Sequence, residues 1–325
     1  MTTVLSSLLI VGDGGDDVVD AVALSGNPNA QFTIEGKGGS DWLVGGAWND
    51  KLYGGAGGDS LDGGEGRDKL WGGAGHDRLS GGGDQDSLLG EAGHDSLDGG
   101  NGKDRLWGGA GNDTLDGGGD ADQLRGEAGN DRLRGQNGDD LMWGGAGNDR
   151  GEGGQGRDML WGDDGNDLLE GGGDDDELFG GSGDDTLEGG CGNDHLAGGT
   201  GFDFYTGGEG DDVFYLDVAG SSATPEEDAI TDFTFGLIGE GKDVIDLRAF
   251  DAQLVSTTQI TVVNEGAVDG LGSNIKTVYV DLNNDGAANN ISHAEMVIYV
   301  DTGLGGFVRN FVISEGNNPF ADILI

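Results

Sequence analysis

A nine-residue repeat runs without interruption through residues 36–215 and constrains the fold of this chain more than any other feature. Twenty copies follow one another with no insertion or deletion. Glycine fills the first position and aspartate the sixth position in all twenty copies. Glycine fills the fourth position in sixteen copies, and leucine fills the eighth position in sixteen. Such a short fixed period is typical of a solenoid, in which each repeat packs only against its neighbours.

Each copy predicts one turn followed by one short strand. The glycine-rich first six residues suit a tight turn that needs positive φ angles. A single large apolar residue between polar ones predicts a strand with one inward-facing side chain. Two copies then form a coil of 18 residues, and the leucine rows of two sheets meet in a thin core. Gly151 takes the place of leucine in the thirteenth copy, so we expect a weak point there.

Charge limits the partners that this chain can have. Its 325 residues include 62 acidic and 16 basic side chains, which give a net charge of −46. With only 34% hydrophobic residues, the chain would stay disordered unless something neutralised its carboxylates. Nucleic acid is not expected as a partner, because phosphate binding needs a basic face. No apolar run is long enough to span a bilayer, and a divalent cation is the natural candidate.

The repeat G-G-x-G-x-D-x-U-x resembles the RTX (repeats-in-toxin) calcium-binding β-roll. The resemblance covers 180 of the 325 residues. It implies an all-β fold: a right-handed parallel β-roll of about ten 18-residue coils with Ca²⁺ in the loops, capped by a C-terminal antiparallel β domain. The expected domains are an N-terminal cap over 1–35, the β-roll over 36–215 and a C-terminal β cap over 216–325.

The resemblance also implies which atoms hold the ion. One loop would give the main-chain carbonyls of its positions 2 and 4 and its aspartate, and the loop one coil later would give the carbonyls of positions 1 and 3 and its own aspartate. In one example loop pair, the ligands are Gly55, Gly57, Asp59, Gly72, Ala74 and Asp77. The carboxylate ligands in all are Asp41, Asp50, Asp59, Asp68, Asp77, Asp86, Asp95, Asp104, Asp113, Asp122, Asp131, Asp140, Asp149, Asp158, Asp167, Asp176, Asp185, Asp194, Asp203 and Asp212.

The number of ions has an upper bound. The twenty loops form two stacks of ten with nine gaps each, so at most 18 ions fit, and their +36 would leave a net charge of −10. Ca²⁺ prefers oxygen ligands, whereas Zn²⁺ would need cysteine or histidine. The single cysteine, Cys191, rules out a disulfide within the chain. We therefore expect folding to be coupled to calcium binding.

The ninth position of each copy points outward from a strand. In the even-numbered copies it is aromatic seven times in ten, whereas in the odd-numbered copies it is mostly acidic or polar and never aromatic. Because alternate copies lie on opposite sheets, we expect one aromatic and one acidic face. The aromatic ladder either stiffens its sheet or binds a cell-surface or glycan partner. Its members are Tyr53, Trp71, Trp107, Trp143, Trp161, Phe179 and Tyr215.

The flanks carry weaker signals. Residues 1–12 predict a first strand, and residues 12–20 match the repeat once, out of phase, with room for an extra ion. The stretches DAITDF and GKDVIDLRAF resemble the segment that follows the repeats in serralysin-type proteases. A second candidate metal site comprises Asp281, Asn283 and Asp285, which match half of an EF-type loop, although Ser292 stands where glutamate is expected.

Export by the type I secretion machinery to the cell surface or exterior is expected on two grounds. Residues 320–325 resemble an uncleaved type I signal, and the first residues lack the basic region of a secretory signal.

Two classes of function stay open. The first is a non-enzymatic, calcium-dependent structural or interaction protein of a surface, a matrix or an adhesive layer. The alternative is an RTX-class enzyme, such as a protease, lipase or epimerase relative. The motifs H-E-x-x-H and G-x-S-x-G are absent, and Asp104 stands where a Walker A motif needs serine or threonine, so we expect no enzyme. Mixed residue types at position 5 disfavour ice binding, and no amphipathic segment favours pore formation.

Overall fold

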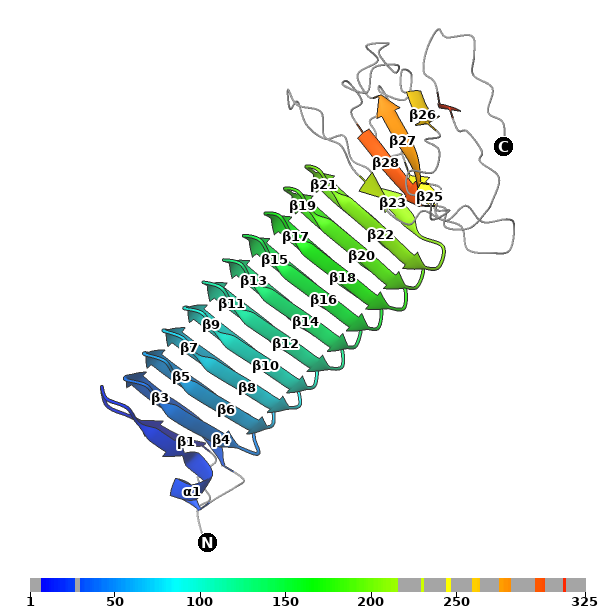
Figure 1. The fold of residues 1–325 in the computed structure, drawn as a ribbon. Coiled ribbons are helices and arrows are strands. Elements are labelled where there is room, and N and C mark those ends of the chain that lie inside the picture. Colours follow the sequence, from blue (N-terminus) through cyan, green and yellow to red (C-terminus); the bar gives the residue numbers. More distant parts are fainter. Residues whose placement is uncertain are drawn as a thin grey trace. The chain divides into compact units, whose positions relative to one another are not determined.

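The computed structural model describes residues 7–26 and 30–215 and, beyond them, the short strands 229–230, 244–246, 259–263, 275–281, 296–301 and 312–313 (Figure 1). The chain divides into two units, Met1–Asp164 and Gly165–Ile325, which are described separately. Apart from one short helix, the described elements are all strands, and most pair in parallel at a spacing of one 18-residue coil. The predicted parallel β-solenoid of about ten coils is confirmed.

In the first unit, two parallel sheets alternate along the chain. Sheet A has the strand order β1-β3-β5-β7-β9-β11-β13-β15-β17, and sheet B has the order β2-β4-β6-β8-β10-β12-β14-β16. The elements are β1 (Ser7–Val11), β2 (Val18–Asp20), α1 (Ala21–Ser25), β3 (Gln31–Gly38), β4 (Trp42–Gly46), β5 (Lys51–Ala56), β6 (Ser60–Glu65), β7 (Lys69–Ala74), β8 (Arg78–Gly83), β9 (Ser87–Ala92), β10 (Ser96–Asn101), β11 (Arg105–Ala110), β12 (Thr114–Gly119), β13 (Gln123–Ala128), β14 (Arg132–Asn137), β15 (Leu141–Ala146), β16 (Arg150–Gln155) and β17 (Met159–Asp164).

The second unit continues the pattern and ends in antiparallel strands. One parallel sheet has the order β18-β20-β22-β24, the other has β19-β21-β23-β25, and β28-β27-β26-β29 form an antiparallel sheet. The elements are β18 (Leu168–Gly173), β19 (Glu177–Ser182), β20 (Thr186–Cys191), β21 (His195–Thr200), β22 (Phe204–Glu209), β23 (Val213–Tyr215), β24 (Ala229–Ile230), β25 (Val244–Asp246), β26 (Gln259–Val263), β27 (Ile275–Asp281), β28 (Met296–Asp301) and β29 (Val312–Ile313).

The eighth-position side chains form the core. Leu52 and Leu70 pair in sheet A, Leu61 and Leu79 pair in sheet B, and each exposes at most 2% of its surface. In parallel strands that lie about 4.8 Å apart, identical residues one coil apart stack directly on each other. The sequence period is thus converted into continuous leucine rows.

Gly151 lies in β16 and pairs with Leu133 of β14, so the repeat keeps its phase where the leucine row is broken. Gly151 is buried and its φ angle is not positive, so a leucine fits its backbone conformation. We expect Gly151→Leu to raise the free energy of unfolding of the calcium-loaded protein by about 2 kcal/mol or more, by analogy with buried leucine truncations. Thermal unfolding measures this gain.

The smaller variant Gly151→Ala is the matched control for Gly151→Leu and should give only a fraction of the gain. An unchanged melting temperature in Gly151→Leu would mean that neighbouring side chains already fill the gap.

The N-terminal segment adds a coil in an irregular register. The predicted first strand is present as β1, and β2 pairs in parallel with β4. The main-chain N–H of Asp17 donates to Oδ1 of Asp41 at 2.8 Å, a step of 24 residues instead of 18. Helix α1 lies within the extra residues, with the Asp20 carboxylate accepting from the Ala23 N–H as N-cap. This insertion explains why the match at residues 12–20 is out of phase.

Six short strands are described after Tyr215. The first two, β24 and β25, pair in parallel with β22 and β23, and only the later ones are antiparallel. Asp281 ends β27, whereas Asn283 and Asp285 of the second candidate metal site lie outside the described residues. The predicted secretion signal at residues 320–325 also lies outside them.

Candidate metal centre

The sixth-position aspartates form two ladders, one at each edge where a loop enters a strand. All twenty predicted carboxylates lie in the described part of the chain, and each residue exposes 4% of its surface or less. Aspartate is rarely this buried unless it is paired or bound to a metal. Because the strands keep their register, aspartates one coil apart stand in line.

Main-chain amides hold one oxygen of each carboxylate. The N–H of Asp59 donates to Oδ1 of Asp77 at 2.7 Å, and the N–H of Asp77 donates to Oδ1 of Asp95 at 2.8 Å. On the other ladder, the N–H of Asp86 donates to Oδ1 of Asp104 at 2.7 Å. Each carboxylate therefore bonds to the preceding coil, and its orientation is fixed.

The second oxygen of these carboxylates has no such partner. It is buried and accepts no hydrogen bond in Asp41, Asp59, Asp68, Asp77, Asp86, Asp95, Asp104, Asp113, Asp122, Asp131, Asp140, Asp185 and Asp194. A buried carboxylate oxygen without a partner is energetically unfavourable, because it has lost its water. Buried oxygens of this kind recur along both aspartate ladders.

First-position glycines make room for this oxygen. A Cβ on Gly99 would stand 2.6 Å from Oδ2 of Asp104 and 2.6 Å from the carbonyl oxygen of Gly117, one coil further on. A carboxylate oxygen and a carbonyl oxygen thus converge on one point, which a side chain would fill. The invariant glycine at position 1 follows from this close approach.

The other loop carbonyls face the gap between coils in the predicted sense. The carbonyls of Gly55 and Gly57 point towards Gly73 and Gly75 of the next coil, where a Cβ would collide with them. From the opposite side, the Ala74 carbonyl accepts the N–H of Gly57 at 2.7 Å. The carbonyls of positions 2 and 4 therefore point towards the next coil, and those of positions 1 and 3 point towards the preceding coil.

This donor set fits a hard divalent cation. Each gap offers carboxylate and carbonyl oxygens from two loops, and Ca²⁺ takes six to eight such ligands. Within the described residues, no group of three or more histidine, cysteine or acidic side chains is placed to bind a metal. Zn²⁺ would need the nitrogen and sulfur donors that the gaps lack.

Burial shifts the acidity of the ladders. It raises the pKa of Asp86 to about 8, with repulsion from Asp68 and Asp104 adding to the effect and the Asp68 N–H partly offsetting it. Burial likewise raises the pKa of Asp122 to about 8 and that of Asp131 to about 7. Without a cation, Asp86 and Asp122 resist ionisation at neutral pH.

A ladder of fifth-position side chains runs beside the aspartate ladders and was not foreseen from the sequence. Fifth-position side chains accept the N–H of the residue one coil further on: Asn112 Oδ1 accepts from Asn130 at 3.0 Å, and Asn130 Oδ1 accepts from Asn148 at 2.9 Å. His76 Nδ1 accepts from the His94 N–H at 2.8 Å, and the two rings stack. The asparagines at 18-residue spacing were the available signal.

The ninth-position aromatic side chains of the first unit lie on sheet A, as expected. Tyr53 stacks on Trp71 with ring centroids 4.4 Å apart, and Trp143 stacks on Trp161 at 5.0 Å. Arg125 lies over the Trp143 ring at 4.4 Å. In the second unit, Phe179 and Tyr215 lie on the sheet that contains β19 and β23.

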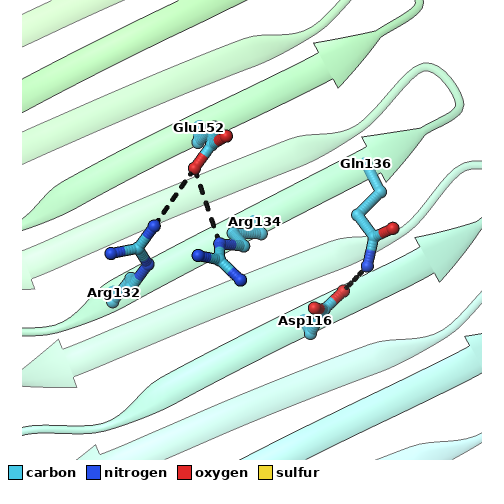
Figure 2. Close-up of polar contacts among 5 residues, drawn as sticks. All are labelled: Asp116, Arg132, Arg134, Gln136 and Glu152. Carbon is cyan, nitrogen blue, oxygen red and sulfur yellow. Dashed lines mark hydrogen bonds and ion pairs between the residues drawn. The ribbon is translucent and has the colours of Figure 1, made fainter.

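The acidic face of sheet B is interrupted at β14 and β16. Glu152 pairs with Arg132 at 3.4 Å and with Arg134 at 3.5 Å, and Gln136 donates to Asp116 (Figure 2). Arg132 and Arg150 are cross-strand neighbours. The expected acidic face therefore carries a basic cluster with its own carboxylate partner.

Comparison with known families agrees with this geometry. The family model for the RTX calcium-binding nonapeptide repeat matches residues 35–70, 53–88, 80–115, 89–124, 116–151, 152–187 and 188–218. No curated protein matches the chain. The matches join into one stretch over 35–218, which is more than half of the chain. With the buried carboxylate ladders and the parallel coils, they show that this chain belongs to the RTX calcium-binding nonapeptide repeat family.

Proposed function

We propose that this protein is a secreted, calcium-dependent structural or interaction protein of a cell surface, a matrix or an adhesive layer, and that its roll folds outside the cell when calcium binds. One observation carries the proposal: buried carboxylate oxygens without hydrogen bonds are stacked coil upon coil. A divalent cation would supply the positive charge that lets these oxygens lie close together. In a chain that folds without metal, a stack of buried carboxylates would only destabilise the folded state.

The proposed ligands follow the loop geometry. Asp59 and Asp77 would hold one ion together with the carbonyls of Gly55, Gly57, Gly72 and Ala74. Each interior aspartate would then contribute to two adjacent gaps. The same set recurs in every loop pair of both ladders, and the repeat number limits the total to 18 ions.

The proposed location follows from the chemistry of the ligands and from the family. Calcium sites of extracellular modules are commonly weak enough to need the high calcium concentration outside cells. The helix among the described residues is far too short to cross a bilayer. We propose export through the type I secretion machinery, a route that RTX repeats are typical of.

Native mass spectrometry during a calcium titration tests this function. The expected result is a series of bound ions that reaches well beyond two and does not exceed 18, with a fall in the mean charge state as the roll becomes compact. Magnesium at the same concentration is the control, because its rigid octahedral preference fits these loops poorly. Binding of only one or two calcium ions would contradict the proposal.

Acidification is expected to replace calcium in part. In an unfolded chain an aspartate has a pKa of about 3.9, whereas burial raises that of Asp86 and Asp122 to about 8 in the folded roll. The raised pKa means that the calcium-free roll is most stable at low pH and loses stability as pH rises from about 4 to about 8. In chelator, β-sheet circular dichroism should therefore be stronger at pH 5 than at pH 8.

Calcium should reverse this dependence, because the ion binds only the ionised carboxylates. The calcium concentration needed for half-maximal folding should rise as pH falls from 7 to 5. If the chelated protein gained no β-structure at pH 5, the ladders would not be the groups that oppose folding without metal.

A further inference from the structure

A groove of about 550 Å³ runs along sheet A where the loops enter β7, β9, β11, β13 and β15. Its lining includes the buried carboxylates of one ladder, from Asp68 to Asp122, and the fifth- and seventh-position side chains on either side of them. The groove crosses five successive strands of one sheet. A ligand that lies in it would therefore be long and extended.

Four exposed cations line this groove: Arg67, Lys69, Lys103 and Arg105. On sheet B, by contrast, Arg132 and Arg134 contact Glu152. Among the described residues, none of the four groove cations has a carboxylate within ion-pair distance. A chain with 62 acidic and 16 basic side chains thus keeps four cations unpaired in one groove.

The cations recur at a fixed spacing. Lys69 begins β7 and Arg105 begins β11, two strands apart in sheet A, and Arg67 and Lys103 precede them at the same offset. With adjacent strands about 4.8 Å apart, the two cation pairs lie roughly 10 Å apart. The coil between them presents the uncharged Gln85 and Ser87 to the groove.

Aromatic rings share this spacing. Trp71 and Trp107 follow Lys69 and Arg105 by two residues, so each ring lies on the same outer face as the cation before it. Both rings are half-buried, and Trp71 is stacked on Tyr53. Flat rings beside cation pairs suit a ligand with apolar ring faces and regularly spaced negative charges.

We propose that this groove binds a linear anionic polysaccharide that presents an acidic group towards the protein on every second sugar. In an extended two-fold chain of 1,4-linked sugars, one sugar advances by nearly the spacing of adjacent strands. Acidic groups on alternate sugars would then meet the two cation pairs, with sugar faces against Trp71 and Trp107. The proposal rests on the proposed function, because the groove requires the calcium-folded roll.

A nucleic acid strand fits the groove less well. It carries a phosphate on every nucleotide, so its negative charges are more closely spaced than the two cation pairs. The exposed acidic side chain of Asp84 lies on the coil between the two cation pairs and would repel a phosphate there. A sparsely charged polymer avoids this repulsion.

Isothermal titration of the full-length, calcium-loaded protein with a β-1,4-linked oligoglucuronate tests the proposal. The cello-oligosaccharide of the same length is the neutral match. The double variants Arg67→Gln/Lys69→Gln and Lys103→Gln/Arg105→Gln should each lose about tenfold or more in affinity, because charge-assisted hydrogen bonds are removed. Arg78→Gln removes an exposed cation on sheet B and should bind like the unaltered protein.

Circular dichroism in calcium separates the two proposals. If the unaltered protein gains no β-structure with calcium, the proposed function fails. If it folds but its groove variants bind the oligoglucuronate as tightly as before, the groove proposal alone is overturned. Equal binding of the neutral oligosaccharide, or tighter binding of an oligothymidylate, would overturn it as well.

Discussion

Removal of calcium by EDTA at pH 8 is expected to unfold the roll and to abolish its β-sheet circular dichroism. A site whose dissociation constant is a hundredth of the ambient calcium concentration contributes about 2.7 kcal/mol. Several such sites exceed the 5–15 kcal/mol by which a typical domain is stable. The thin leucine core offers little compensation, and the ladders would leave buried carboxylates such as Asp86 and Asp122 facing one another.

Size-exclusion chromatography or small-angle scattering should show the expansion that accompanies this loss. Adding calcium back should restore the compact form, whereas the same concentration of sodium chloride, matched for ionic strength, should not. A protein that stayed compact and ordered in EDTA at pH 8 would refute the role assigned to the carboxylates.

Asp113→Asn, which removes one charge from the middle of a ladder, is expected to weaken calcium-dependent folding strongly. Oδ1 of Asp113 accepts the N–H of Asp95 at 2.7 Å, and its buried Oδ2 accepts no hydrogen bond. Asparagine retains the first contact and replaces the second oxygen with an amide, which cannot bind a cation. Native mass spectrometry should then show up to two fewer calcium ions, because the residue lies between two gaps.

The calcium midpoint of folding of Asp113→Asn should rise about tenfold, as expected when a charged ligand is lost. Asp62→Asn removes the same charge from the exposed outer face of sheet B and should leave both the ion count and the midpoint unchanged. Equal effects of the two variants would mean that net charge, and not the ladder position, governs calcium binding.

The fold could be read from the sequence because its strongest signals are strictly local. Position 8 gave the core rows, and Gly151 lies in phase at the one place where a row is broken. The opposite facing of Gly55 and Ala74 towards one gap also agrees with the ligand pattern that the family implies. The core rows depend on the nine-residue period alone, whereas the ligand pattern came from the resemblance to the family.

Features that depend on how coils stack could not be read in the same way. Asp17 contacts Asp41 over a separation of 24 residues, six more than one coil, and helix α1 lies within this longer segment. The hydrogen bond from the Asn130 N–H to Asn112 needs the 18-residue offset and a particular side-chain rotamer. Whether Arg67 and Lys103 form ion pairs depends on how far the stacked strands place the nearest carboxylates from them.

The direction of the amide-to-carboxylate bonds gives the stack two unlike ends. In each pair the earlier coil donates, as Asp59 does, and the later coil accepts, as Asp77 does. A growing stack would thus present bare acceptors to a coil that arrives from the N-terminal side, and bare donors to one that arrives from the C-terminal side. The roll therefore has a direction, and its two ends offer different hydrogen-bonding groups. A cap that fits one end would not fit the other.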